Sequence, residues 1–189
     1  MSKKKHIDIL VIGSGPGGYA SAFRAADLGR NVIIVDKDPT LGGVCLNRGC
    51  IPSKTLLHIA KVLEETESLK NMGVSFAKPK INISAVRDWK NKIIKQLSGG
   101  ITQMAKARKV ETIEGIATFI SNKEIQIETK SEKENITFDH CIIAAGSSSS
   151  KIPGIPFENK NVLTSKTALD IEKIPKNLLV IGGGYIGLE

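Results

Sequence analysis

Residues 7–36 read IDILVIGSGPGGYASAFRAADLGRNVIIVD, which is an apolar run, a glycine cluster, a helical pattern and a second apolar run. Unbroken apolar runs that end in glycine are typical of strands buried on both faces of a parallel sheet. The residues between the runs predict a helix that ends at Gly29. The segment therefore predicts a strand–helix–strand unit of about 30 residues, with strands at 7–12 and 31–36.

The glycine cluster fits the pattern G-x-G-x-x-G, in which each glycine has a physical role. Gly13 allows a tight turn, Gly15 lets backbone amides approach a pyrophosphate, and Gly18 lets the helix pack closely against the strand. Asp36 ends the next strand, where a carboxylate can accept hydrogen bonds from an adenosine ribose. A dinucleotide site is the interpretation we favour, and glycines that serve only the turn are the alternative. The predicted site comprises Gly13, Gly15, Pro16, Gly17, Gly18 and Asp36.

A second copy of the glycine pattern, GGGYIG, overlaps the end of the apolar run NLLVIG at residues 177–182. We expect that run to form a strand and Gly182, Gly184 and Gly187 to form a second phosphate-binding turn. The helix and further strand that a dinucleotide site needs do not follow within the 189 residues. We therefore expect this copy to bind nothing by itself.

The chain between the two glycine patterns changes from helical to strand periodicity. The expected elements are amphipathic helices at 52–70 and 84–108, the second interrupted at Gly99–Gly100, antiparallel strands between 110 and 140, a buried strand at 141–146 and a short helix near 165–172. The predicted fold class is α/β, Rossmann-like, with long helices and an inserted antiparallel β segment.

The connection KIPGIP at 151–156 is rich in proline and glycine and predicts a domain boundary. We expect a dinucleotide-binding domain at 1–150. Residues 151–189 would then be a linker and the first strand and phosphate loop of a second such domain.

The composition limits the classes of partner. A net charge of +8 would permit nucleic-acid contact, but the lysines are scattered and aromatic residues make up only 4% of the chain, so no basic and aromatic stripe can stack bases. No apolar run approaches the roughly 20 residues of a membrane span. The apolar run near the amino terminus is too short for a signal sequence, so we expect a cytoplasmic protein or a processed organelle protein. Three cysteines in such a reducing compartment argue against a disulfide scaffold.

Cys45 and Cys50 lie five positions apart in GGVCLNRGCIPSK, residues 42–54. A zinc site usually requires a second pair of ligands, and the remaining cysteine, Cys141, lies in a predicted buried strand. Two unrelated buried thiols are another possibility, but they explain neither the glycines nor Lys54. A redox pair explains both, so we favour a redox pair and expect no metal.

The spacing has a geometric consequence for such a pair. In a regular helix, residues five apart have Cα atoms roughly 8.6 Å apart, whereas a disulfide needs about 4.4–6.8 Å. We therefore expect the chain to leave helical geometry at Gly49 and to begin a new helix near Pro52. Cys50 then lies at or just before a helix N-terminus that stabilises a thiolate, with Lys54 one turn on. Cys45 is the sulfur that a substrate thiol could attack.

A disulfide beside a dinucleotide loop needs an electron partner. Nicotinamide transfers hydride, whereas a flavin can take two electrons and exchange them with a thiol–disulfide couple. The expected cofactors are therefore FAD at the first glycine loop and NAD(P) at the second.

The motifs VIGSGPGGY, GGVCLNRGCIPSKTLLH, IIAAGS and VIGGGYIGLE, in this order, resemble those of the pyridine nucleotide–disulfide oxidoreductases. The resemblance covers the whole chain. The segments CLN.GCIPSK.LLH and W..KI..QL..GI (89–101) are most similar to the lipoamide dehydrogenases of that family. Glutathione and mercuric reductases are the alternatives.

The resemblance implies FAD-dependent oxidation of protein-bound dihydrolipoamide by NAD+ through a Cys45–Cys50 disulfide, the E3 reaction of 2-oxo acid dehydrogenase complexes. Cys45 would exchange with the dithiol, and Cys50 would donate charge to the flavin. The implied partners are lipoyl domains and, for the full-length protein, a second subunit of a homodimer. The other residues implied to lie along the cofactor are Lys37, Gly42, Gly43, Val44, Lys54, Gly115, Ala117, Ala145, Gly146 and Ser147.

Some residues depart from the family pattern. Asp36 stands where Glu is commoner, so its reach is one methylene shorter, and Arg48 stands where many relatives have Val. None of His6, His58 and His140 matches the motif of the family's acid–base histidine, which belongs to a later domain. We therefore expect the amino-terminal part of a longer enzyme, able at best to bind FAD and inactive in turnover.

Overall fold

The computed structural model describes residues 5–170 and 172–189. The chain divides into two compact units. The first, called here the sheet unit, comprises residues 1–47 and 96–147, and the second, called the helical unit, comprises residues 48–95 and 148–189. The first four residues, which hold most of the basic amino terminus, lie outside the described part of the chain.

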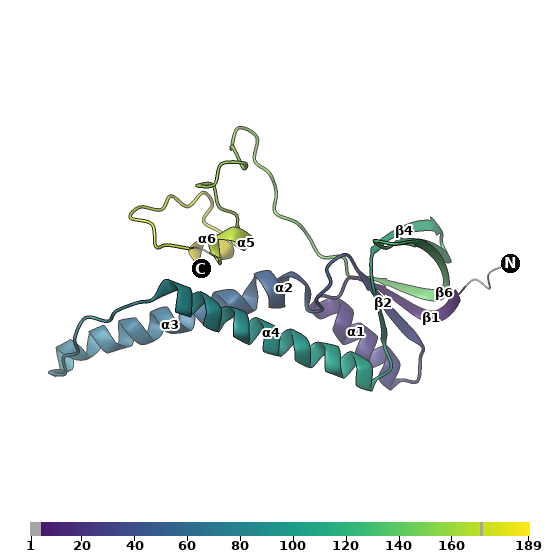
Figure 1. The fold of residues 1–189 in the computed structure, drawn as a ribbon, viewed down its shortest axis with the longest axis horizontal. Helices are drawn as coiled ribbons and strands as arrows, with labels where there is room; N and C mark the ends of the chain where they lie inside the picture. Colours follow the sequence, from purple (N-terminus) through teal and green to yellow (C-terminus); the bar gives the residue numbers. More distant parts are fainter. Residues whose placement is uncertain (1–4, 171) are drawn as a thin grey trace. The chain divides into compact units, whose positions relative to one another are not determined.

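The sheet unit contains the predicted strand–helix–strand arrangement. β1 (Lys5–Ile12) pairs in parallel with β2 (Val32–Asp36), and β3 (Glu111–Glu114) pairs in parallel with β2 on its other side. α1 (Pro16–Asp27) packs on β1 and β2 (Figure 1). Gly29 follows the helix with a φ of +81°, as a glycine that ends a helix should. The α/β class is confirmed.

An antiparallel set completes the six-stranded sheet, whose order is β3-β2-β1-β6-β5-β4. β4 (Ile116–Ser121) pairs antiparallel with β5 (Glu124–Glu128), which pairs antiparallel with the first part of β6 (Lys133–Ile143). From Ile136 to Ile143, β6 pairs in parallel with β1. The prediction of separate strands on either side of residue 140 was therefore wrong. The apolar pattern changes there because the strand's neighbours change, not because the strand ends.

The expected antiparallel strand at 110–120 was only half right. Its first part is β3, which is parallel to β2, and its second part is β4. Gly115 separates them: its amide donates to the Asp36 carbonyl at 2.8 Å, and a Cβ there would lie 2.7 Å from Cγ2 of Ile127. The chain therefore turns from one part of the sheet to the other at a position with no room for a side chain.

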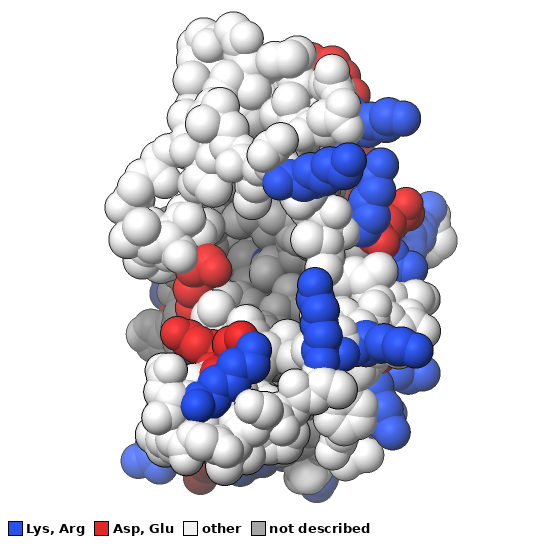
Figure 2. Space-filling model, turned by 90° about the vertical axis from the view of Figure 1, so that its left-hand side faces the viewer, with Lys and Arg blue, Asp and Glu red and all other residues white. Residues whose placement is uncertain are grey.

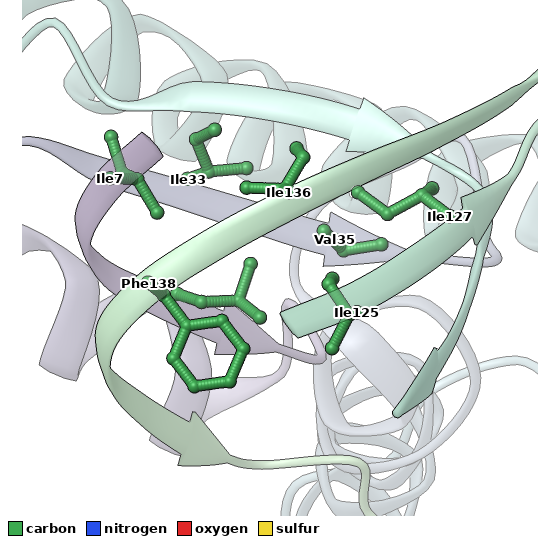
Figure 3. Close-up of a cluster of buried hydrophobic side chains, with 8 residues drawn as sticks. Ile7, Ile33, Val35, Ile125, Ile127, Ile136 and Phe138 are labelled. Atoms are coloured by element: carbon green, nitrogen blue, oxygen red, sulfur yellow. The ribbon is translucent and has the colours of Figure 1, made fainter. Parts of the chain in front are cut away.

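Side chains from the parallel and antiparallel strands form one apolar core (Figure 3). The antiparallel strands thus cover a face of the parallel sheet, which explains why β1 and β2 are apolar on both faces. The core fixes the carboxyl ends of β1 and β2, where the glycine loop and Asp36 lie. Its members are Ile7, Leu10, Ile33, Val35, Ile125, Ile127, Ile136 and Phe138.

The helical unit contains α3 (Cys50–Ser68), the 3-10 turn η1 (Leu69–Met72), the first half of α4 (Ile83–Ala107), α5 (Ser165–Ala168) and α6 (Tyr185–Leu188). Lys90 on α4 is only 3% exposed. Its ammonium donates to the Leu169 carbonyl at 2.7 Å and to Oδ1 of Asp170 at 2.8 Å. The hydrogen bond from Lys90 lowers the pKa of Asp170. Lys90 therefore attaches the chain after α5 to α4.

α4 runs without a break through Gly99 and Gly100, contrary to the predicted interruption. Each interior glycine costs about 1 kcal/mol relative to alanine. The flanking residues Ser98 and Ile101 are buried, and this packing holds the helix together.

The strand predicted at 177–182 is also absent: the structure assigns no strand or helix to these residues. The four apolar side chains Leu178, Leu179, Val180 and Ile181 are 52–84% exposed. A strand forms only when neighbouring strands satisfy its backbone groups, and within the described chain no strand pairs with this run.

One face of the described chain shows how its charged side chains are distributed. On the face drawn in Figure 2, Lys and Arg side chains stand among uncharged and acidic ones and do not merge into one basic stripe. None of the helices in residues 5–170 and 172–189 combines the length and apolar composition needed to cross a membrane.

Candidate functional site

The first glycine loop joins β1 to α1 in a conformation that requires glycine. Gly13 has a φ of +99°, and its amide donates to the Val35 carbonyl at 2.8 Å. A Cβ on Gly13 would lie 2.2 Å from the Ala144 carbonyl oxygen, and a Cβ on Gly18 would lie 1.9 Å from the Gly13 carbonyl oxygen. The tight turn and the close helix packing predicted for these two glycines are confirmed.

The N-terminus of α1 has the features of an anion site. Gly15 precedes the helix in an extended conformation, and Pro16 begins it, where a missing N–H is harmless. The amides of Gly17 and Gly18 come before the first intrahelical bond, which Tyr19 donates to the Gly15 carbonyl at 2.9 Å. The helix dipole adds partial positive charge. These groups fit the diphosphate of a dinucleotide.

Asp36 ends β2 beside this loop, and the chain itself holds its carboxylate. Oδ2 accepts hydrogen bonds from the amide and the hydroxyl of Ser14, both at 2.6 Å, and Oδ1 accepts one from the Asp38 amide at 2.9 Å. Burial alone would raise the pKa of Asp36, but these hydrogen bonds and the charge of Lys37 bring that pKa below its ordinary value. The carboxylate is therefore ionised at neutral pH.

The segment before the cysteines packs on the glycine loop. The Gly42 amide donates to the Ser14 carbonyl at 2.9 Å. Gly43 has a φ of +61° and would place a Cβ 2.5 Å from Cα of Gly15, so only glycine allows this approach. The contact brings the start of α2, with the exposed Val44, beside the predicted diphosphate site.

The two cysteines lie on consecutive helices. Cys45 is in α2 (Gly43–Arg48) and is half-buried, and Cys50 is the first residue of α3 and is exposed. Gly49 between them has φ −145° and ψ −107°, far from helical values. The predicted break at Gly49 is therefore confirmed. Cys50 begins a helix of 19 residues, and Pro52 lies in its first turn.

Lys54 forms an ion pair that the sequence interpretation missed. Its ammonium lies 3.0 Å from Oε1 of Glu189, and hydrogen bonds from Lys54 and then Ser53 lower the pKa of Glu189. Glu189 ends the motif VIGGGYIGLE, and the motif alone predicts no role for it. The signal that could have found it is a single acid at the end of an otherwise uncharged motif.

The second glycine loop has the backbone of the first without its surroundings. Gly182 has a φ of +111°, and a Cβ on Gly187 would lie 2.1 Å from the Gly182 carbonyl oxygen. Gly184 precedes α6 in an extended conformation. α6 contains the four residues Tyr185–Leu188, and whether this loop binds a dinucleotide stays a prediction.

The remaining predicted residues lie in three places. Gly115 is bonded to the Asp36 carbonyl, and Ala117 follows on β4. The Ala144 amide donates to the Ile12 carbonyl at 2.7 Å, so the exposed residues that follow, Ala145 to Ser147, leave the sheet beside the first glycine loop. Lys37 is exposed next to Asp36. Whether any of these residues contacts a cofactor stays a prediction.

These features together are a glycine loop at the carboxyl ends of parallel strands, followed by two cysteines at a helix boundary. A family model described as pyridine nucleotide-disulphide oxidoreductase matches residues 7–189. The chain belongs to this family. The resemblance inferred from the motifs is thus confirmed.

Within the pyridine nucleotide-disulphide oxidoreductases, the chain is similar to proteins named dihydrolipoyl dehydrogenase. The chain is 48% identical over 189 residues to a protein of Vibrio cholerae named dihydrolipoyl dehydrogenase, matching 100% of this chain and 40% of that protein. It is 40% identical over 183 residues to the dihydrolipoyl dehydrogenase of Manduca sexta, matching 96% of this chain and 37% of that protein. The chain spans about two fifths of the length of these relatives.

A solved structure supports the fold. The Cu(II) complex of the HOCl-induced flavoprotein disulfide reductase RclA from Escherichia coli superposes with a TM-score of 0.82 at 26% identity, covering 97% of this chain and 38% of that one. Pyridine nucleotide-disulphide oxidoreductases use FAD and NAD. These are the two cofactors expected from the sequence.

The third cysteine, Cys141, lies on β6 in the sheet unit. Cys141 is half-buried, not fully buried as expected, and packs against the core of the sheet unit, where burial raises the pKa of its thiol. Among residues 5–170 and 172–189, no three His, Cys, Asp or Glu side chains form a group that could hold a metal ion.

Proposed function

We propose that the protein oxidises protein-bound dihydrolipoamide with NAD+ and that this chain carries the FAD site and the redox disulfide. The observation that carries the proposal is the placement of two cysteines at a helix boundary directly after a segment packed on the glycine loop. Gly43 touches Gly15, and Cys45 follows two residues later. The names of the relatives support the choice of lipoamide as substrate.

The proposed chemistry of the cysteines is a thiol–disulfide exchange. One thiol of dihydrolipoamide loses its proton to solvent and attacks Sγ of Cys45 as a thiolate, the Cys45–Cys50 bond breaks, and Cys50 leaves as a thiolate at the N-terminus of α3. The second substrate thiol then displaces Cys45. The substrate leaves as a cyclic disulfide, and the two cysteines hold its two electrons. FAD, when bound, supplies a two-electron acceptor that can pass these electrons to NAD+.

The residues proposed to hold FAD have distinct tasks. The first-turn amides of α1 bind the diphosphate, and Asp36 accepts a hydrogen bond from the adenosine ribose. Lys54, held by Glu189, carries a positive charge one turn after Cys50. The second glycine loop is proposed to bind NAD once a longer helix follows it. The further residues proposed to line FAD are Lys37, Gly42, Gly43, Val44, Gly115, Ala117, Ala145, Gly146 and Ser147.

The proposed partners follow from the substrate. Protein-bound lipoamide is presented by lipoyl domains of 2-oxo acid dehydrogenase complexes, and the full-length protein is proposed to be a homodimer in the cytoplasm. Reduced thiols in that compartment would let the Cys45–Cys50 pair cycle.

Two measurements on the 189-residue chain test the cofactor and the disulfide. Titration with FAD, followed by flavin fluorescence, should reach one FAD per chain. Peptide mapping of the oxidised chain without reductant should recover Cys45 and Cys50 in one linked peptide, while Cys141 stays alkylatable after unfolding. A chain that binds no FAD, or a linkage to Cys141, would contradict the proposal.

The substrate class needs the full-length enzyme. With NADH as donor, lipoamide should be reduced much faster than glutathione disulfide or Hg(II), and a preference for either of those would replace the proposed substrate. The 189-residue chain should show negligible NADH–lipoamide turnover. Family-like turnover by this chain would show that the second loop is complete enough to act.

A further inference from the structure

Ser14 is the residue between the first two glycines of the loop, and the glycine pattern requires no particular side chain at that position. In the structure it is completely buried. Its amide and its hydroxyl both donate to Oδ2 of Asp36 at 2.6 Å, and its carbonyl accepts from the Gly42 amide at 2.9 Å. Ser14 therefore connects the glycine loop, the end of β2 and the segment that leads to the cysteines.

The hydrogen bonds limit what the Asp36 carboxylate can offer a ligand. An ionised carboxylate has about four acceptor positions, two on each oxygen. Ser14 takes both positions on Oδ2, and the Asp38 amide takes one on Oδ1. One acceptor position remains, and it is on Oδ1.

We propose that Ser14 is a positioning residue for Asp36: its hydroxyl holds Oδ2 at the glycine loop, so that a single acceptor position on Oδ1 is presented to the adenosine ribose of FAD. This inference rests on the proposed FAD site. The physical reason is the short aspartate side chain, which brings its carboxylate within reach of the hydroxyl. A hydrogen bond to an ionised oxygen is shorter and stronger than one between neutral groups.

Few other groups act on the Asp36 carboxylate. Lys37 follows it in sequence and lowers its pKa, and the Asp38 amide bonds Oδ1. On the neighbouring strand β3, Glu114 lies in register with Asp36, and its carboxylate forms an ion pair with Lys130 at 2.7 Å. None of these groups replaces the Ser14 hydroxyl, so removing that hydroxyl isolates its effect.

The test compares Ser14→Ala with the unchanged 189-residue chain. Because the pKa of Asp36 is lowered in the folded protein, its contribution to stability is present at neutral pH and is lost as the pH falls through the folded pKa. Ser14→Ala should move the acid-unfolding midpoint of the FAD-free chain to higher pH. Because Oδ1 would then be less well placed for the ribose, the substitution should also weaken FAD binding at pH 7 by up to about tenfold, the value of one hydrogen bond from the ribose to the charged carboxylate.

Two controls separate positioning from general damage. Ser21→Ala removes another serine hydroxyl near the loop, which donates to the Gly18 carbonyl at 2.9 Å and does not bond Asp36, and it should leave the acid midpoint in place. In an Asp36→Asn background, Ser14→Ala should no longer shift the midpoint. Ser14→Gly serves as a second variant if the alanine variant does not fold.

The outcomes are distinct. A loss of stability that is equal at every pH, or a shift that persists in the Asp36→Asn background, would overturn the role of Ser14. If the unchanged chain binds no FAD, the proposed function fails, while the acid unfolding of the FAD-free variants still decides whether Ser14 holds Asp36.

Discussion

The two glycine loops of this chain have nearly the same backbone in very different surroundings. Gly13 and Gly182 have φ values of +99° and +111°, and Gly15 and Gly184 are extended with φ values of −68° and −74°. A Cβ on Gly18 would lie 1.9 Å from the Gly13 carbonyl oxygen, and a Cβ on Gly187 would lie 2.1 Å from the Gly182 carbonyl oxygen. The spacing of the glycines is therefore sufficient to form the turn.

The surroundings decide whether the turn can act as a site. The first loop follows a strand with neighbours on both sides and precedes the 12 residues of α1. The second follows the exposed run 177–181 and precedes the four residues of α6. The turn is a local property, but the first loop also packs against the end of β6, where Ala144 lies more than 130 residues away in the sequence.

Alanine substitutions at Gly13 and Gly182, the first glycine of each loop, should show the largest difference in unfolding free energy between the two loops. Gly13→Ala combines an unfavourable φ with a Cβ 2.2 Å from the Ala144 carbonyl oxygen, so it should cost roughly 4 kcal/mol of unfolding free energy. Gly182→Ala meets nothing within 4 Å, and its exposed segment can shift, so about 1 kcal/mol or less is expected. Urea unfolding measures the unfolding free energy of both variants. Equal losses would contradict the conclusion that the first loop is packed more tightly than the second.

The residues three positions before each loop give the next largest contrast. Leu10 is completely buried and Leu179 is 84% exposed, although they occupy equivalent places in ILVIGSG and LLVIGGG. Leu10→Ala should cost about 3 kcal/mol through lost burial and the cavity left behind. Leu179→Ala should change the unfolding free energy by less than about 0.5 kcal/mol. A comparable cost at both positions would mean that residue 179 is buried in solution.

Lys90→Met tests how the chain leading to the second loop is attached. The methionine keeps the buried volume but loses the hydrogen bonds to Leu169 and Asp170, so about 1.5 kcal/mol should be lost. Trypsin should then cut faster after Lys173 or Lys176. Lys92→Met is the control, because Lys92 is exposed on the same helix and should give a change below about 0.5 kcal/mol. Unchanged cleavage in the Lys90 variant would show that other contacts hold this segment.

The smallest effect concerns the acid after the second loop. Lys54→Met removes the leading cause of the lowered pKa of Glu189, so that pKa should move up toward its ordinary value. A pH titration of the Glu189 carboxyl carbon by NMR measures the change, and the exposed pair should contribute little to overall stability. A titration that does not move would show that the ion pair is not formed in solution.

The correct predictions rest on features that are local in the sequence. The strand–helix–strand unit, the turn at Gly13 and the helix break at Gly49 each follow from residues within one turn or one strand. The site residues Ser14 and Glu189 were missed because their roles depend on partners 22 and 135 residues away. No periodicity carries that information.

The wrong predictions have the same origin. The run 177–182 has strand composition but no neighbouring strand in the described chain, and Gly99–Gly100 stays helical because its flanking residues are packed. β6 was divided in two because its pattern changes where its partners change. In each case the presence or absence of tertiary contacts, which the local pattern does not contain, decided the structure of the segment.

The pairing of β6 with β1 has a consequence for synthesis. Gly13 packs against Ala144, and Leu10 pairs with Cys141, so contacts at the first loop span more than 130 residues. A ribosome adding about 5–20 residues per second needs roughly 7 to 26 seconds to reach that partner. The first glycine loop is therefore made early, but its contacts are complete only after residue 144 has been added. Until β6 emerges, the apolar edge of β1 has no second neighbour and is open to wrong pairing.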